Sequence, residues 1–296
     1  MRCLLRAAVF PFALLVSAPA LTQSLDAGQD SSEIVVTGAR DRDEQVRDFV
    51  RSLTPAPQGS ISRFIDQVCP TAVGLSSGNK QAVEARLRVV AAAAKIRVAS
   101  PGCVPNAFVI ATPDKRAFIR ALASKQPDAF GMMTARQIRR LSRSAGPAAA
   151  WQLEGPVDAN GIPLPWDDRI GAYTNETTNS GSRIRTIGGR GFDASVVVVE
   201  TDALRGLTAT QLADYAAMRL FAKADPSKLP ASPPPTILTI LEAPMGTAVP
   251  ITLTDWDVGL LRGLYTSPAD LHSNAQRSAI AGELKDQLDS ATRKPD

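Results

Sequence analysis

Hydrophobic and polar positions follow two different periods along this chain, and together they predict a mixed fold of strands and helices. Four consecutive valines at residues 196–199 are the strongest strand signal, because β-branched side chains pack well on a buried sheet. Thr208 is a suitable N-cap for the helix that follows. Its apolar side repeats every three or four residues and includes one charged residue, Arg219. We expect this strand and helix to organise the rest of the chain.

The same two periods recur in residues 43–145. Amphipathic spacing predicts helices over residues 43–53, 61–68, 78–95, 114–125 and 134–144. Short apolar runs predict strands over residues 72–75, 96–99 and 107–111. The order strand, helix, strand, helix indicates a small α/β unit.

Residues 146–290 have a different character, richer in Gly, Pro, Asn and Thr before the valine strand. The expected elements are strands over 151–153 and 183–187, a glycine turn over 188–191, a proline-rich spacer over 226–235, an ambiguous apolar segment over 236–241, and helices over 254–265 and 274–288. The predicted class is therefore α+β and rich in helices. Residues 43–145 and 146–290 are two regions or one continuous domain.

The first twenty residues have the pattern of a secretory signal peptide. Arg2 and Arg6 precede an apolar run over residues 7–16, and a small-x-small site ends at Ala20. No later stretch has eighteen uninterrupted apolar residues, so we expect an exported protein, periplasmic or secreted, with no transmembrane segment after cleavage. Residues 21–42 are polar, and we expect a disordered lead with one extended patch at residues 33–38.

Composition and charge exclude little. Hydrophobic residues make up 44% and charged residues 21% of the chain, as in ordinary globular proteins. Cleavage would remove two arginines and lower the formal net charge from +4 to +2, so the basic balance gives little support for a nucleic-acid partner. The helix at residues 134–144 carries four arginines without interleaved aromatic residues, which favours a solvated face: Arg136, Arg139, Arg140 and Arg143.

Two cysteines, Cys69 and Cys103, would remain after removal of Cys3 with the signal peptide. In an oxidising compartment such a pair indicates one disulfide. A redox pair would normally be a Cys-x-x-Cys at the start of a helix, and these two are far apart in sequence.

The sequence offers few groups for catalysis, and no cofactor motif. His272 is the single histidine, which excludes the usual multi-histidine zinc sites. A catalytic triad would have to use this histidine, which lies beside Asp270 and Ser273. The glycines at residues 188–191 precede a strand and lack the Gly-Lys-Ser/Thr ending of a phosphate loop.

Carboxylates beside tryptophans are the remaining chemical candidates, since paired carboxylates hydrolyse glycosides and tryptophans form sugar platforms. The candidate binding residues are Trp151, Glu154, Trp166, Asp167 and Asp168. A further pair, Asp255 and Asp257, flanks Trp256 in the first turn of a predicted helix, where negative charge is stabilising. A carboxylate-dependent, glycosidase-like hydrolase of the cell envelope is therefore an alternative function.

Residues 253–265 have the pattern Leu-Thr-x-x-Asp-x-x-Leu-Leu-Arg-x-Leu-Tyr. This pattern and the preceding valine strand and helix resemble an uncharacterised family of exported proteobacterial proteins, in which the helix is zincin-like and begins His-Glu. Here residues 209–214 read Ala-Thr-Gln-Leu-Ala-Asp, without the His-Glu-x-x-His ligands and base. The resemblance implies a degenerate metallopeptidase-like scaffold, a pseudoenzyme without its metal.

Residues 34–38, Ile-Val-Val-Thr-Gly, resemble a segment near the mature N-terminus of TonB-dependent outer-membrane receptors. The resemblance implies a contact with TonB, although the chain is too short for a receptor barrel. The function that the sequence favours is a non-catalytic periplasmic binding or assembly protein with an envelope protein as its partner.

Overall fold

The computed structural model describes residues 30–296, except 57–58, 177–180, 184, 245 and 294–296. The predicted signal peptide and residues 21–29 of the lead lie outside the described residues. From Asp41 onward the chain forms one compact unit.

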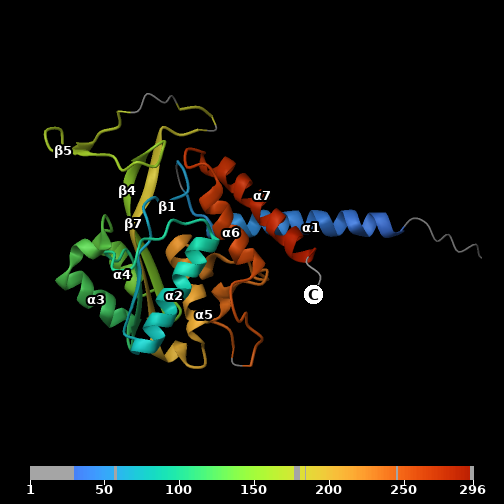
Figure 1. The fold of residues 1–296 in the computed structure, drawn as a ribbon, viewed down its shortest axis with the longest axis horizontal. Coiled ribbons are helices and arrows are strands. Elements are labelled where there is room, and N and C mark those ends of the chain that lie inside the picture. Colours follow the sequence, from blue (N-terminus) through green and yellow to red (C-terminus); the bar gives the residue numbers. More distant parts are fainter. Residues whose placement is uncertain (1–29, 57–58, 177–180, 184, 245, 294–296) are drawn as a thin grey trace, which may run out of the picture. The chain divides into compact units, whose positions relative to one another are not determined.

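The described residues form seven α-helices, seven strands and four short 3₁₀ helices (Figure 1). The helices are α1 (Asp30–Leu53), α2 (Ser77–Ala93), α3 (Lys115–Lys125), α4 (Ala135–Ser142), α5 (Ala209–Phe221), α6 (Asp255–Thr266) and α7 (Ser273–Thr292). The strands are β1 (Arg63–Phe64), β2 (Pro70–Val73), β3 (Ala107–Thr112), β4 (Ala148–Asp158), β5 (Trp166–Asp167), β6 (Ala172–Tyr173) and β7 (Gly188–Glu200). The 3₁₀ helices are η1 (Pro127–Phe130), η2 (Thr201–Leu204), η3 (Pro226–Lys228) and η4 (Ile237–Thr239).

The main sheet is built around β7, the strand that contains the four valines. One edge of β7 pairs in parallel with β1 and, further along, with β3, which in turn pairs in parallel with β2. The other edge of β7 pairs with β4, the one antiparallel member. β4 therefore forms an outer edge of the sheet, whereas the valines are buried in its middle.

Helices cover both faces of this sheet. Val197 and Val199 point toward the large core that includes α2 and α5, whereas Val196 and Val198 point toward the smaller core below α3 and α4. Figure 1 shows the two helix layers on opposite sides of the strands. The four valines of β7 are buried on both faces of the sheet, which is why this run is continuously apolar instead of alternating.

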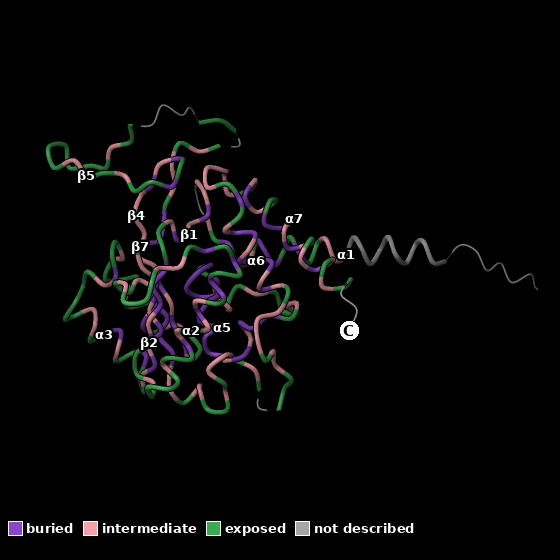
Figure 2. Tube along the Cα trace, viewed as in Figure 1, coloured by how far each residue is buried: buried purple, intermediate pink, exposed green. Residues whose placement is uncertain are grey.

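Helix α5 is the most deeply buried element. Every residue from Gln211 to Phe221 is buried, and Figure 2 shows buried residues concentrated along this helix and the sheet. Thr208 caps it as predicted: its hydroxyl accepts from the Gln211 N–H, and the Gln211 side chain accepts from the Thr208 N–H.

The predicted disulfide is confirmed. Cys69 lies just before β2 and Cys103 in the loop between α2 and β3, and their sulfurs are bonded. The bond joins the two ends of the β2–α2–β3 unit that the sequence predicted.

Two sequence predictions between residues 61 and 99 are wrong. Residues 61–68 form no helix: Phe64 belongs to β1 beside Phe192 of β7, and Val68 makes a single bridge to Val98. The apolar residues of this segment are nevertheless buried: Ile61, Phe64 and Val68. Their helix-like spacing therefore belongs to an irregular segment that enters the core. Residues 96–99 contribute that one bridge and no strand.

Three further expectations need correction. The glycines of residues 188–191 are not a turn but the first part of β7, paired with the far end of β4. The described residues of 183–187, which exclude 184, form one bridge, Arg185 to Leu271, instead of a strand. Residues 33–38 belong to α1, so they present no extended patch, and the lead is helical from Asp30.

The predicted mixed, helix-rich class is confirmed, and the sheet is largely parallel with helices on both faces. Regions 43–145 and 146–290 contribute strands to this one sheet, through β3 and β7. None of the helices that the structure describes combines the length and apolar character needed to cross a membrane.

Candidate functional site

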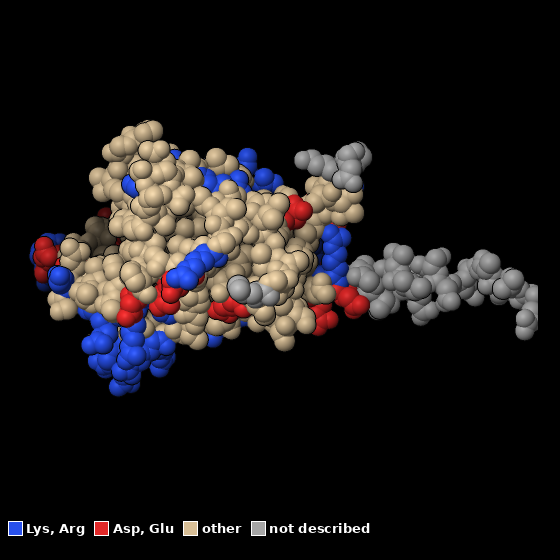
Figure 3. Space-filling model, turned by 90° about the horizontal axis from the view of Figure 1, so that it is seen from below, with Lys and Arg blue, Asp and Glu red and all other residues tan. Residues whose placement is uncertain are grey.

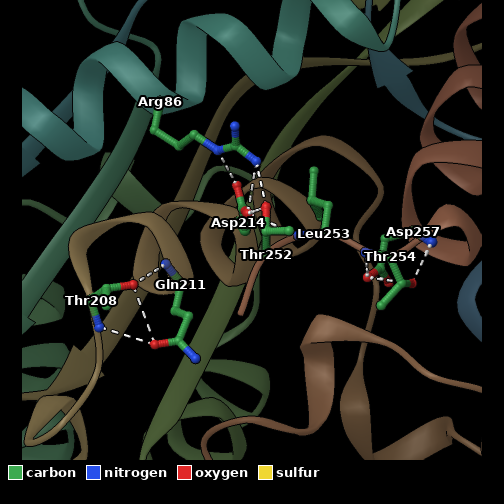
Figure 4. A network of polar contacts seen from close by, with 8 residues as sticks. All are labelled: Arg86, Thr208, Gln211, Asp214, Thr252, Leu253, Thr254 and Asp257. Atoms are coloured by element: carbon green, nitrogen blue, oxygen red, sulfur yellow. Dashed lines mark hydrogen bonds and ion pairs between the residues drawn. The ribbon is translucent and has the colours of Figure 1, made fainter. Parts of the chain in front are cut away.

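Two polar residues of α5, Gln211 and Asp214, are engaged in contacts that hold the fold together (Figure 4). Arg86 of α2 donates from Nε and Nη2 to the two carboxylate oxygens of Asp214, at 2.7 and 2.9 Å. The same carboxylate accepts from the Thr252 hydroxyl and the Leu253 N–H. The described residues contain no group of three or more His, Cys, Asp or Glu that could hold a metal ion.

Polar and aromatic groups line a cavity beside β4. Its volume is about 480 Å³, within the range of small-molecule and peptide sites. It extends over the edge of β4, from α4 and the segment before it to the C-terminal end of α5 and η3. The lining includes Phe130, Met133, Leu141, Ala150, Trp151, Gln152, Glu154, Arg190, Arg219, Lys223, Asp225 and Lys228.

One wall of the cavity is aromatic and apolar. The Trp151 ring stacks on Phe130 with centroids 4.9 Å apart and planes inclined by 16°. The Trp151 indole N–H donates to the Ala129 carbonyl at 2.8 Å, which fixes the ring. Met132, 85% exposed, and Met133 extend this surface, and methionine adapts to ligands of irregular shape.

The opposite wall contains a buried arginine without a carboxylate partner. Arg219 is 8% exposed, and its Nη1 donates to the Tyr215 hydroxyl at 2.8 Å. Its Nε is buried and has no hydrogen-bond partner among the described residues. Burial raises the pKa of Tyr215 against the opposing effect of Arg219, so the phenol stays neutral and supplies no counter-charge. A guanidinium buried in this way is costly unless an anion joins it.

The far end of the cavity carries a charged cluster. Glu154 binds Arg190 at 3.2 Å and Lys223 at 2.5 Å. Lys223 has a φ of 53°, a left-handed conformation that costs a non-glycine residue about 1 kcal/mol, just after the end of α5. The cavity lining holds four cationic side chains and two carboxylates, so the field inside it favours an anion.

The predicted site residues divide into two separate groups. Trp151 and Glu154 line the cavity, whereas Trp166, Asp167 and Asp168 belong to the β5–β6 hairpin, outside it. In the hairpin the Trp166 indole N–H donates to Asp168, and Asp167 pairs with Arg169. The structure therefore does not bring the five candidates together.

The other candidates for catalysis also have structural partners. Asp257 is buried and accepts from Thr236, Ile237 and Thr254, and it completes the capping box of α6, whose N-cap is Thr254. Asp255 accepts from Gln287. Asp270 pairs with Arg185, and His272 lies at the start of α7 with Nε2 3.1 Å from the Ser182 carbonyl oxygen.

The arginines of α4 are solvent-exposed, and among the described residues none of them forms an ion pair. Figure 3 shows a dense group of basic side chains at the end of the molecule where α3 and α4 lie. This agrees with the solvated face that the sequence indicates.

Sequence reasoning missed Arg219 and Lys223 as site residues. A signal was present for Arg219, because a charged residue at helical spacing within the apolar stripe of a buried helix needs a reason for its burial. No comparable local signal marks Lys223, whose role depends on Glu154, a residue distant in sequence.

Comparison with known proteins gives no match: no family model fits the chain, and neither a curated protein nor a solved structure is similar to it. The geometry of the cavity therefore carries the functional argument.

Proposed function

We propose that this chain is a non-catalytic binding protein whose cavity beside β4 holds an organic anion with an apolar part. The observation that carries the proposal is Arg219, a buried cation that lines the cavity and whose Nε has no hydrogen-bond partner among the described residues. Arginine presents a planar set of donors that fits a carboxylate or phosphate, and its charge persists at every physiological pH.

The aromatic wall supports the apolar part of this ligand. Trp151 and Phe130 form a rigid stack, and rigid aromatic surfaces bind at low entropic cost. The carboxylates that a hydrolase would need are already engaged, Glu154 by two cations and Asp167 by Arg169. Binding therefore accounts for these contacts better than acid–base catalysis does.

Two further parts of the proposal concern origin and location. The Leu253–Tyr265 pattern supports a degenerate metallopeptidase-like scaffold, and the N-terminal pattern supports export. A disulfide agrees with export, since disulfides persist mainly in oxidising compartments. N-terminal sequencing of the protein purified from the native host should give Leu21 as the first residue; an intact Met1 would contradict export.

The test uses three probes: 4-phenylbutyrate, its neutral amide, and acetate. The amide keeps the apolar part of phenylbutyrate without the charge, and acetate keeps the charge without the apolar part. Calorimetric titration should show that phenylbutyrate binds more tightly than either of the other two. Arg219→Gln should weaken its binding by about tenfold or more, equivalent to about 1.4 kcal/mol.

Arg205→Gln is the matched control, because Arg205 is exposed and pairs only with Asp202 in its own turn. It should leave binding unchanged. Equal affinity for the acid and the amide, or a failure of all three probes to bind, would overturn the proposal.

A further inference from the structure

The outer edge of β4 is open over part of its length. Among the described residues β4 pairs with β7 on one side only. At its far end the chain covers the other side itself: Leu164 donates to the Pro156 carbonyl, Asp158 donates to the Ile162 carbonyl, and Val157 bridges to Pro163. Over residues 148–153 the described residues make no such backbone hydrogen bond or bridge.

The register shows which backbone groups face outward. The Ser195 N–H donates to the Asn106 carbonyl at 2.8 Å, so the backbone of Ser195 faces β3 and not β4. Ser195 lies opposite Gln152, and an antiparallel pair of this kind directs the N–H and C=O of both residues away from each other. The N–H and C=O of Gln152 therefore point out of the sheet.

Alternation extends this result along the strand. Glu200 donates to the Pro147 carbonyl, as expected if every second residue of β7, starting from Val196, faces β4. Ala150, opposite Val197, thus has the same outward orientation as Gln152. None of these four outward groups has a hydrogen-bond partner in the part of the chain that the structure describes. Ala150 and Gln152 also line the cavity.

We infer that the cavity receives an extended polypeptide segment, which adds to β4 as a new edge strand and places an acidic group at Arg219. The inference rests on the proposed function for the anion and names its ligand class. Free backbone groups provide the affinity in such complexes, and pockets on alternate faces provide the specificity.

The two faces of the edge predict the sequence of the segment. Trp151 belongs to the core on the α4 side, whereas Arg219 belongs to α5 on the other side of the sheet. Side chains of an added strand alternate between these faces. The matching segment alternates apolar residues, directed toward Trp151, with acidic residues, directed toward Arg219 and Lys223.

Charge also distinguishes this occupant from a second copy of the chain. Two copies paired through β4 would bring together two linings with four cations and two carboxylates each. The repulsion between like charges disfavours that pairing and favours an acidic segment.

The experiment measures binding of a fluorescent, end-blocked peptide of alternating valine and glutamate, six residues long, by anisotropy. Two further peptides carry N-methyl groups on either the first, third and fifth or the second, fourth and sixth residues. In a strand only one set of N–H groups faces β4, so one methylated peptide should lose about tenfold or more in affinity and the other should bind like the parent.

Two changes test whether the acidic side chains of the peptide interact with Arg219. One is a peptide with glutamine in place of glutamate, and the other is the Arg219→Gln protein. Each should lose about tenfold, and the Arg219→Gln protein should no longer distinguish the two peptides. Ala150→Pro removes one outward N–H without disturbing the ladder to β7, and it should weaken binding of the peptide.

Equal binding of both methylated peptides would overturn the added strand while leaving the anion site standing. If phenylbutyrate fails as well, the proposed function also fails. A dimer in solution that Ala150→Pro dissociates would assign the edge to a second copy and overturn the inference.

Discussion

Arg86 of α2 and Asp214 of α5 form a two-point ion pair in which the carboxylate is completely buried, with Nε–Oδ1 and Nη2–Oδ2 distances of 2.7 and 2.9 Å. The hydrogen bond to Asp214 is the main reason that the pKa of Arg86 is raised. Thr252 and Leu253 donate to the same carboxylate, so Asp214 joins α2, α5 and the segment that leads to α6.

Loss of this carboxylate should be strongly destabilising. We expect Asp214→Ala to lower the free energy of unfolding by about 3 kcal/mol, because Arg86 and two further donors lose their acceptor. Urea denaturation measures the difference. The exposed pair of Asp202 and Arg205 is the control, and Asp202→Ala should change stability by less than about 0.5 kcal/mol. Similar losses for both variants would contradict this account.

Alkaline pH should destabilise the protein partly through Tyr265. Its hydroxyl donates to the Phe221 carbonyl at 2.9 Å and accepts from the Phe64 N–H, and burial raises its pKa. Above about pH 10 the unfolded tyrosine loses its proton while the folded one keeps it. The stability that this group contributes is therefore full below about pH 10 and falls as pH rises toward the folded pKa, by up to about 1.4 kcal/mol per pH unit.

Urea denaturation between about pH 8 and pH 11 tests the assignment, since the range brackets the ordinary tyrosine pKa. Tyr265→Phe should show a shallower alkaline decline than the unmodified protein. Burial also raises the pKa of Tyr215, so part of the decline should remain. Tyr173→Phe, at a half-exposed residue, should retain the full decline. An unchanged slope in Tyr265→Phe would refute the assignment.

Close packing of α6 on α7 depends on two glycines of α6. A Cβ at Gly259 would lie 2.5 Å from Leu284 Cδ1 and 3.0 Å from its Cα, and one at Gly263 would lie 2.9 Å from Ile280 Cα. We expect Gly259→Ala and Gly263→Ala each to cost about 1–3 kcal/mol, since the helices must move apart.

Gly282 of α7 provides the opposite case in the facing helix. Its added Cβ would have no neighbour within 4 Å. Gly282→Ala should therefore stabilise the protein by about 0.5–1 kcal/mol through helix propensity alone. Thermal or urea denaturation of the three variants should give opposite signs for the two helices, and a loss at Gly282 would show that crowding is not the cause.

The disulfide should contribute mainly by restricting the unfolded chain. Its cysteines are 34 residues apart, and a loop of this length corresponds to about 4 kcal/mol in the chain-entropy model. We expect the double variant Cys69→Ser, Cys103→Ser to lose about 2–4 kcal/mol in urea. Reduction of the unmodified protein should give the same loss, and no difference between oxidised and reduced protein would contradict the prediction.

The sequence by itself determined the elements that depend on neighbours along the chain. The cap Thr208 was predictable because a capping hydroxyl accepts from the N–H three residues further along the chain. The valine strand followed from four adjacent β-branched residues. The disulfide followed from the two cysteines that would remain after the predicted cleavage.

The tertiary structure alone decided which surfaces are buried and which edges are open. Residues 61–68 have helical spacing, yet pairing of Phe64 beside β7 makes them irregular, because the core accepts apolar residues from any backbone that reaches it. Trp151 and Glu154 line one cavity and Trp166 lies outside it. Tertiary packing, and not the sequence near each residue, decides this.

The isolation of Arg219 and the outward backbone of Gln152 depend on contacts between segments far apart in sequence. Within the part of the chain that the structure describes, the guanidinium of Arg219 bonds Tyr215 of its own helix and its Nε has no partner. The backbone N–H and C=O of Gln152 face outward because the Ser195 N–H opposite it donates to the carbonyl of Asn106, the residue before β3. Local propensity carries no information about such pairings, which register and packing decide together.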